Sequence, residues 1–140
     1  MRALGIDFGE RRIGVAMSDP TGTLASPLET VHRRAGKRPP LARLEEIARS
    51  HGVEALVVGL PLDLRGVETE WCAQVRVMGD ELARRLGVPV AYVDERMTSV
   101  RAERSIRSAG LPKRKREDKA RVDAGAATLI LQAWLDRPRP

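Results

Sequence analysis

Cysteine and aromatic residues are both scarce in this chain. Its 140 residues include a single cysteine, Cys72, so no disulfide can form within the chain. This usage is typical of a reducing compartment, and the N-terminus lacks the pattern of a signal peptide, so we expect a cytoplasmic protein. Aromatic residues make up 3% of the chain, which disfavours folds that stack nucleobases on aromatic rings. No apolar run approaches the roughly 18 residues of a membrane span, so no membrane partner is expected.

Positive charge exceeds negative charge. The chain has 25 lysine and arginine residues against 19 aspartate and glutamate residues, a net charge of +6. This balance favours a polyanionic partner, RNA or DNA, and it is equally compatible with a role in solubility alone. The hydrophobic fraction of 42% is enough to build a core, and the length fits one domain over residues 1–140.

Apolar periodicity and turn residues divide the chain into alternating elements. Short apolar runs bounded by turn residues predict strands, and apolar residues at i, i+4 and i+7 predict helices. The expected strands are 3–8, 12–18, about 24–31, 55–59 and 88–93. Four helices are expected: one that begins near residue 41, one over 71–86 that ends before Gly87, one from Thr98 or Ser99 to about 108, and one over about 119–135. A charged loop is expected at 110–118.

The order of these elements predicts an α/β fold. Three consecutive strands form an antiparallel meander, and the later strands alternate with helices that can cross over to parallel neighbours. The result is a mixed sheet with helices on both faces, which is the architecture of the ribonuclease H-like fold.

Asp7 is a carboxylate inside an apolar strand. A buried carboxylate without compensation costs several kcal/mol, so its presence in the strand 3–8 points to a function. Its neighbours on the same side, Gly5 and Gly9, are expected to leave open space above it. The alternative is that Asp7 only initiates the turn of the following hairpin.

Two further acids stand at comparable positions. Glu95 follows the strand 88–93, and Asp94 competes with it because neighbouring strand residues point to opposite faces. Glu95 is preferred, with an ion pair to Arg96 as its structural alternative. Asp123 shares the apolar face of the last helix with Ala127, Ile130 and Trp134, or pairs as a core carboxylate with Lys119. Carboxylates that converge at strand ends favour Mg²⁺ or Mn²⁺, and two such ions about 3.5–4 Å apart can hydrolyse a phosphodiester.

Four motifs in the chain resemble those of one known family. The first is Gly5-Ile6-Asp7-Phe8-Gly9 with Arg12, Gly14, Ala16, Ser18 and Asp19, and the second is Val58-Gly59-Leu60-Pro61-Leu62 with Gly66. The third is Val93-Asp94-Glu95-Arg96-Met97-Thr98-Ser99-Val100 with Ala102 and Glu103, and the fourth is Asp123 with Ala126-Ala127 and Leu129-Ile130-Leu131-Gln132. These motifs are similar to those of the YqgF/RuvX family of pre-16S rRNA nucleases and Holliday junction resolvase homologues. They occur in the same order as in that family and extend from residue 3 to about 135.

The resemblance implies a ribonuclease H-like fold and an acidic metal site at Asp7, Glu95 and Asp123. It also implies a nuclease that matures the 5′ end of the 16S rRNA precursor, or one that acts as a junction resolvase or in DNA repair. A symmetric junction would require a homodimer, and the sequence leaves monomer and homodimer open. A nucleic-acid-binding module without turnover is the alternative from another class.

Basic residues flank the expected acids. Arg96 follows Glu95 directly, and the remaining cations precede or begin the helix that carries Asp123. We expect them to contact phosphates without reading sequence, although a solvated loop and helix face would have the same composition. They are Arg101, Arg104 and Arg107, the run Lys113-Arg114-Lys115-Arg116, and Lys119.

Overall fold

The computed structural model describes residues 1–34, 36–98 and 119–138, without the side chains of Met97 and of residues 119–123. No helix in this part of the chain is long and apolar enough to cross a membrane. The strands are β1 (Ala3–Phe8), β2 (Arg12–Ser18), β3 (Ala25–His32), β4 (Ala55–Leu60) and β5 (Val90–Asp94). The helices are α1 (Leu41–Ser50), α2 (Glu70–Leu86), the 3₁₀ turn η1 (Glu95–Met97) and α5 (Lys119–Leu135).

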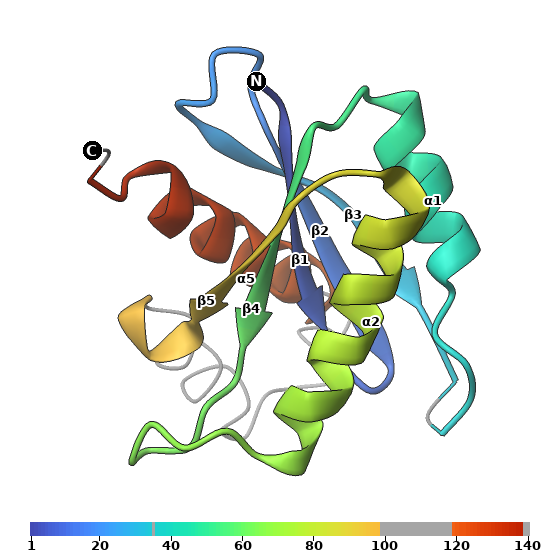
Figure 1. Ribbon diagram of the computed structural model, residues 1–140, viewed down its shortest axis with the longest axis vertical. Coiled ribbons are helices and arrows are strands. Elements are labelled where there is room, and N and C mark those ends of the chain that lie inside the picture. The colour runs from blue at the N-terminus through green and yellow to red at the C-terminus, as the bar shows by residue number, and fades with distance from the viewer. Residues whose placement is uncertain (35, 99–118, 139–140) are drawn as a thin grey trace.

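The five strands form one mixed sheet in the order β3-β2-β1-β4-β5. β1 pairs antiparallel with β2, and β2 with β3, as expected of the meander. β4 lies parallel to both β1 and β5, because α1 and α2 return the chain to the same end of the sheet before each new strand. The predicted mixed sheet is therefore confirmed (Figure 1).

Helices cover both faces of this sheet. α1 and α2 pack on one face through large apolar side chains, among them Leu4, Ile6 and Phe8 from alternate positions of β1. Among the described residues, α5 is the helix on the other face, where the strands contribute mainly small residues. Figure 1 shows the helix pair and α5 on opposite sides of the sheet. The small residues on the α5 face allow a closer approach of helix to sheet than the large ones on the opposite face.

Gly5 is a point of close approach between β1 and α5. A Cβ atom at this position would lie 2.7 Å from Cβ of Leu131 and 2.9 Å from the carbonyl oxygen of Ala127. Gly5 and Gly9 were expected to leave open space above Asp7, but neither has open space at its own position. α5 fills the space over Gly5, and an added Cβ at Gly9 would run into the carbonyl oxygen of Arg12 across the hairpin turn.

Most predicted boundaries agree with the structure, and the exceptions have local causes. β5 begins at Val90, two residues later than expected, because the N–H of Val88 is bound by the carbonyl of Ala83 at the end of α2 and Pro89 has no N–H. Gly87 ends α2 in a left-handed conformation with φ of 68°, as predicted. The turn η1 was not expected. The predicted helix from Thr98 or Ser99 to about 108 and the loop 110–118 lie outside the described residues, apart from Thr98.

Substitution of Gly5 tests the close packing of α5. Gly5→Ala should lower the free energy of unfolding by about 1–3 kcal/mol, because the new methyl group meets Cβ of Leu131 and the carbonyl oxygen of Ala127, which can move only together with α5. The matched control is Gly125→Ala within α5, where no described atom outside the helix backbone lies within 4 Å of an added Cβ. That change should be neutral or stabilise by up to about 1 kcal/mol through helix propensity. Urea unfolding of both variants measures the difference, and equal stabilities would contradict the packing described here.

Candidate active site at the carboxyl edge of the sheet

Three parallel strands end at one edge of the sheet. β1, β4 and β5 run in the same direction, so the end of β1, the loop 61–69 after β4 and the turn η1 after β5 meet there. Loops at the carboxyl ends of parallel strands are where open α/β sheets bind their ligands. The predicted acids are therefore expected at this edge.

Asp7 is a buried carboxylate on the α5 face of this edge. It lies two residues after Gly5 on β1, and alternate strand residues share a face. Only 5% of its surface is exposed, as expected from the apolar strand around it. Asp7 pairs with Gly14 of β2, which has no side chain to contact it from that strand.

Glu95 is buried on the same face. Its exposed fraction is 2%, and its Oε1 atom lies 3.1 Å from the point that a Cβ of Gly59 would occupy. Ile130 of α5 approaches the same point, so Glu95 is on the side of the sheet that α5 covers. β4 separates the strands of Asp7 and Glu95, which puts their backbones about 10 Å apart at two strand spacings. Gly59 lies on that middle strand and adds no side chain between the two acids.

Asp94 has a different environment. Its carboxylate accepts hydrogen bonds from the Arg96 guanidinium, with Nη2 to Oδ2 at 2.7 Å, and from the Arg96 backbone N–H at 2.9 Å. The first interaction raises the pKa of Arg96, and the second caps η1. Arg96 therefore forms its ion pair with Asp94. The ion pair between Arg96 and Glu95 that the sequence left open is not formed.

Arg96 also packs against the loop 61–69. Gly66 has φ of +83°, and a Cβ there would lie 2.7 Å from Nη2 of Arg96. Asp63 organises the loop by accepting hydrogen bonds from the backbone N–H groups of Val67 and Arg65, both at 2.9 Å. The Val67 hydrogen bond is the main cause of the lowered pKa of Asp63. Glycine at position 66 is needed here both for its backbone conformation and for the space that the guanidinium occupies.

α5 places the backbone of Asp123 near this edge. The contacts of Ala127 and Leu131 with Gly5 lie midway along β1, and Gln132 binds the backbone of Ala25, opposite the amino end of β1. The helix therefore runs antiparallel to β1, and Asp123, one turn before Ala127, is on the part of α5 nearest the carboxyl edge. Its side chain is outside the described residues, as is any pairing with Lys119.

The described part of the site is thus a pair of acids. No group of three metal-binding side chains is found among the residues whose side chains are described. Of the expected phosphate contacts, only Arg96 can be placed. The others lie outside the described residues or, for Lys119, have a described backbone alone: Arg101, Arg104, Arg107, Lys113, Arg114, Lys115, Arg116 and Lys119.

Comparison with known proteins identifies the family. A family model described as RuvX, Holliday junction resolvase, matches residues 1–137. The chain belongs to this family. A protein of Mycolicibacterium paratuberculosis named "Putative pre-16S rRNA nuclease" is 46% identical, covering 99% of this chain and 81% of its own length. A relative with the same name in Anaeromyxobacter dehalogenans is 44% identical over 140 residues, the full length of both.

Solved structures support the fold of this RuvX family member. RuvC of Thermus thermophilus in complex with a Holliday junction substrate superposes with a TM-score of 0.57. The match covers 96% of this chain and 93% of that one, with 18% sequence identity. At this identity the likeness shows the ribonuclease H-like fold, as predicted from the order of elements.

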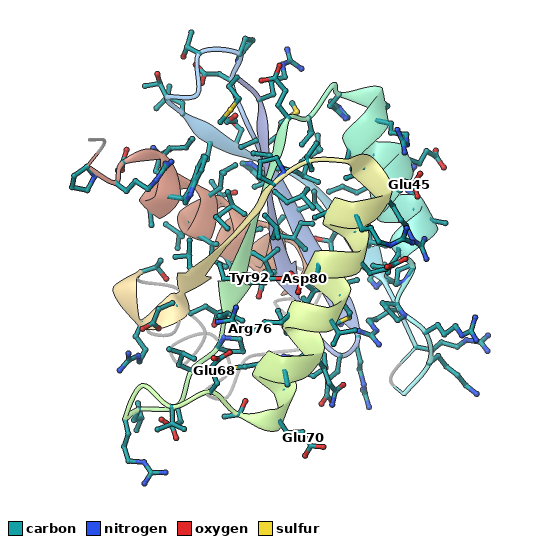
Figure 2. The ribbon with its side chains drawn as sticks, viewed as in Figure 1. Glu45, Glu68, Glu70, Arg76, Asp80 and Tyr92 are labelled. Carbon is teal, nitrogen blue, oxygen red and sulfur yellow. The ribbon has the colours of Figure 1, made fainter. Side chains whose placement is uncertain are left out.

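A polar network that the sequence did not reveal holds β5 against α2. Tyr92 of β5 donates a hydrogen bond from its hydroxyl to Asp80 at 2.5 Å, and its ring lies 4.8 Å from the guanidinium of Arg76. Arg76 is in turn paired with Glu68. Gly79 makes room for the phenol, since a Cβ there would lie 2.6 Å from the hydroxyl oxygen. Figure 2 shows the side chains of Tyr92, Asp80, Arg76 and Glu68 in the region of β5 and α2.

The network matters because β5 is an edge strand whose end carries Asp94 and Glu95. Two signals in the sequence could have indicated it. A tyrosine in an aliphatic strand requires a partner for its hydroxyl, and a glycine within a helix such as Gly79 often marks a close contact.

Alkaline titration of Tyr92 tests this network. Burial, reinforced by the hydrogen bond to Asp80, raises the pKa of Tyr92. Because it is the only tyrosine, phenolate absorbance should show ionisation above the ordinary pKa of about 10, and Asp80→Asn should lower the midpoint. The unfolded chain loses the proton first, so stability should fall as the pH rises above about 10. Protein unfolded in urea is the control, and an ordinary midpoint in the native protein would contradict the network.

Proposed function

We propose that this RuvX family member is a metal-dependent nuclease that hydrolyses phosphodiester bonds. The observation that carries the proposal is the placement of Asp7 and Glu95. Both carboxylates are buried, both lie on the α5 face, and the strands that carry them end at the same edge of the sheet. Carboxylates that meet where parallel strands end supply the oxygen ligands that divalent cations prefer.

The residues at this edge fit Mg²⁺ or Mn²⁺. Both ions prefer oxygen ligands, and Asp7 and Glu95 supply carboxylate oxygens on either side of Gly59. Asp123, from the first turns of α5, is the proposed third ligand, and Asp94 is the substitute for Glu95. When bound, such an ion stabilises negative charge on a phosphate and lowers the pKa of a water molecule, and two ions can divide these roles.

The protein residues orient the ions and the substrate. The rigid strands β1 and β5 fix the two acids, and burial under α5 limits their motion. Arg96, held by Asp94 and Gly66, presents a fixed positive charge beside Glu95 that can bind a phosphate near the cleaved bond. We assign further phosphate contacts to Arg101, Arg104, Lys113, Arg114, Lys115, Arg116 and Lys119.

The 5′ end of the 16S rRNA precursor is the proposed substrate, in the cytoplasm. The names of the relatives in Mycolicibacterium paratuberculosis and Anaeromyxobacter dehalogenans support this choice. The description of the matching family favours a second candidate, resolution of Holliday junctions in DNA. A monomer suffices for the first activity, whereas paired cuts in a symmetric junction require a homodimer. Cleavage of labelled precursor RNA, duplex DNA and four-way junctions by the same preparation distinguishes the two.

Substitution of the acids tests the site. Asp7→Asn, Glu95→Gln and Asp123→Asn should each lower the single-turnover cleavage rate by about 1,000-fold or more, because each removes a proposed metal ligand. Asp94→Asn is the matched control, since that carboxylate binds Arg96, and its effect should be much smaller. Circular dichroism and nucleic-acid binding should be retained in all four. Loss of cleavage in Asp94→Asn with activity retained in Glu95→Gln would assign the ligand to Asp94.

Removal of divalent metal provides an independent test. Cleavage should stop in excess EDTA and return on addition of Mg²⁺ or Mn²⁺, because two carboxylates alone do not generate the nucleophile. Ca²⁺, which takes more ligands at longer distances, is the control and should support binding with little cleavage. Full activity in EDTA would exclude the metal mechanism, and binding without cleavage under all conditions would indicate a binding module.

A further inference from the structure

Six basic side chains gather where the β3–α1 loop meets the β1–β2 turn. The two segments are joined by the hydrogen bond from the backbone N–H of Arg33 to the carbonyl of Arg11, at 2.9 Å, and by the pairing of Arg12 with His32. Glu10 is the one acidic residue in the two segments, 9–12 and 32–38. We call this group the hairpin basic surface, and its members are Arg11, Arg12, Arg33, Arg34, Lys37 and Arg38.

None of these six cations has an ion pair within the part of the chain that the structure describes. Every described ion pair of the protein involves other arginines: Arg43, Arg49, Arg65, Arg76, Arg84, Arg85 and Arg96. Four of the six are exposed, namely Arg11, Arg34, Lys37 and Arg38. The hairpin basic surface is thus a local excess of positive charge that no described carboxylate neutralises. Such charge is available to a polyanion.

The surface lies on the same edge of the sheet as the buried acids. β1 and β3 run in the same direction, so the end of β3 lies beside the β1–β2 turn, which begins two residues after Asp7. Two strand spacings separate β3 from β1, which is about 10 Å. Figure 1 shows the two loops at the end of the sheet where the loop after β4 also lies. Arg96 is on the opposite flank of Asp7, so the acids lie between two positively charged regions.

Arg33 anchors the loop of this surface to the fold. Its guanidinium donates a hydrogen bond to the carbonyl oxygen of Lys37 at 2.8 Å and contacts the sulfur of Met78 in α2 at 3.5 Å. These contacts tie the loop to α2 before any ligand binds. A preorganised loop loses less conformational freedom on binding than a flexible one.

We propose that the hairpin basic surface binds the phosphodiester backbone of the nucleic acid on the β3 side of the cleaved bond. The inference rests on the proposed nuclease function and adds a second binding region to the one around Arg96. The nucleic acid then crosses the carboxyl edge perpendicular to the strands, from the β3–α1 loop, over Asp7, to η1. At about 3.4 Å per nucleotide along a strand, the 10 Å between β1 and β3 corresponds to about three nucleotides.

A salt titration of binding tests the proposal. The loop variant Arg34→Ala/Lys37→Ala/Arg38→Ala, made in the Asp7→Asn background, should bind a duplex at least about tenfold more weakly at 0.1 M salt. The slope of log K against log salt should fall by up to about three units, because each lost phosphate contact no longer releases a counterion. Arg33 is kept to preserve the loop, and fluorescence anisotropy in EDTA separates binding from cleavage.

The matched control removes three other arginines and the same net charge. Arg49→Ala/Arg84→Ala/Arg85→Ala changes residues in the last turns of α1 and α2, each of which has a glutamate partner. For this control, the slope of log K against log salt should equal that of the parent, the Asp7→Asn protein without further changes. An unchanged slope in the loop variant, or an equal fall in both variants, would overturn the proposal. Wild-type protein that binds with the expected slopes but never cleaves would instead contradict the nuclease function and leave this surface in place.

Substrate truncation locates the surface relative to the cleaved bond. Duplexes shortened to two base pairs on one side of the cleavage position should bind the parent and the loop variant equally, because they do not reach the β3–α1 loop. Duplexes shortened on the other side should retain the full difference between the two proteins. A difference that persists whichever side is shortened would show that these cations do not contact nucleic acid beside the active site.

Discussion

The close packing of α5 on a face of small residues is the constraint on which the rest of this structure depends. Gly5 lets the backbone of the helix come into contact with β1, and Gly59 lets Ile130 and Glu95 come together over β4. A side chain at either position would push α5 away from the sheet. That displacement would move Asp123, which α5 carries, relative to Asp7 and Glu95, which the strands carry. Stability and the arrangement of the acids therefore depend on the same contacts.

The two faces of the sheet bury different kinds of side chain. The face under α1 and α2 is filled with large apolar side chains and holds the larger of the two described apolar clusters. The face under α5 has a smaller apolar cluster and holds both buried acids. Polar contacts at the periphery then fix individual elements. The Tyr92–Asp80 hydrogen bond holds the edge strand β5, and Gln132 binds the backbone of Thr23 and Ala25 beside β2. Gln132 thus ties α5 to the sheet.

The arrangement of charge follows the same division. Arginines on α1 and α2 are largely neutralised by glutamates one turn away, so these helices have little local excess of charge. The cations at the carboxyl edge are either held by an acid that leaves the guanidinium accessible, as with Arg96 and Asp94, or have no described acidic partner, as in the hairpin basic surface. A field of this form attracts a polyanion to the edge where the acids lie.

The sequence by itself determined the elements, their order and the burial of Asp7, because apolar periodicity and turn residues are local signals that the fold preserves. It also indicated the family, through motifs that carry three of the acids. Only the tertiary structure decided between Asp94 and Glu95 as the buried acid, since both orientations suit a strand end and the choice depends on contacts with Arg96 and Gly59. It likewise showed that Gly5 allows α5 to pack closely on β1, and that six cations from two separate segments form one surface. Apart from the local pairing of Arg96 with Asp94, these features depend on residues far apart in the chain, and no local pattern encodes such contacts.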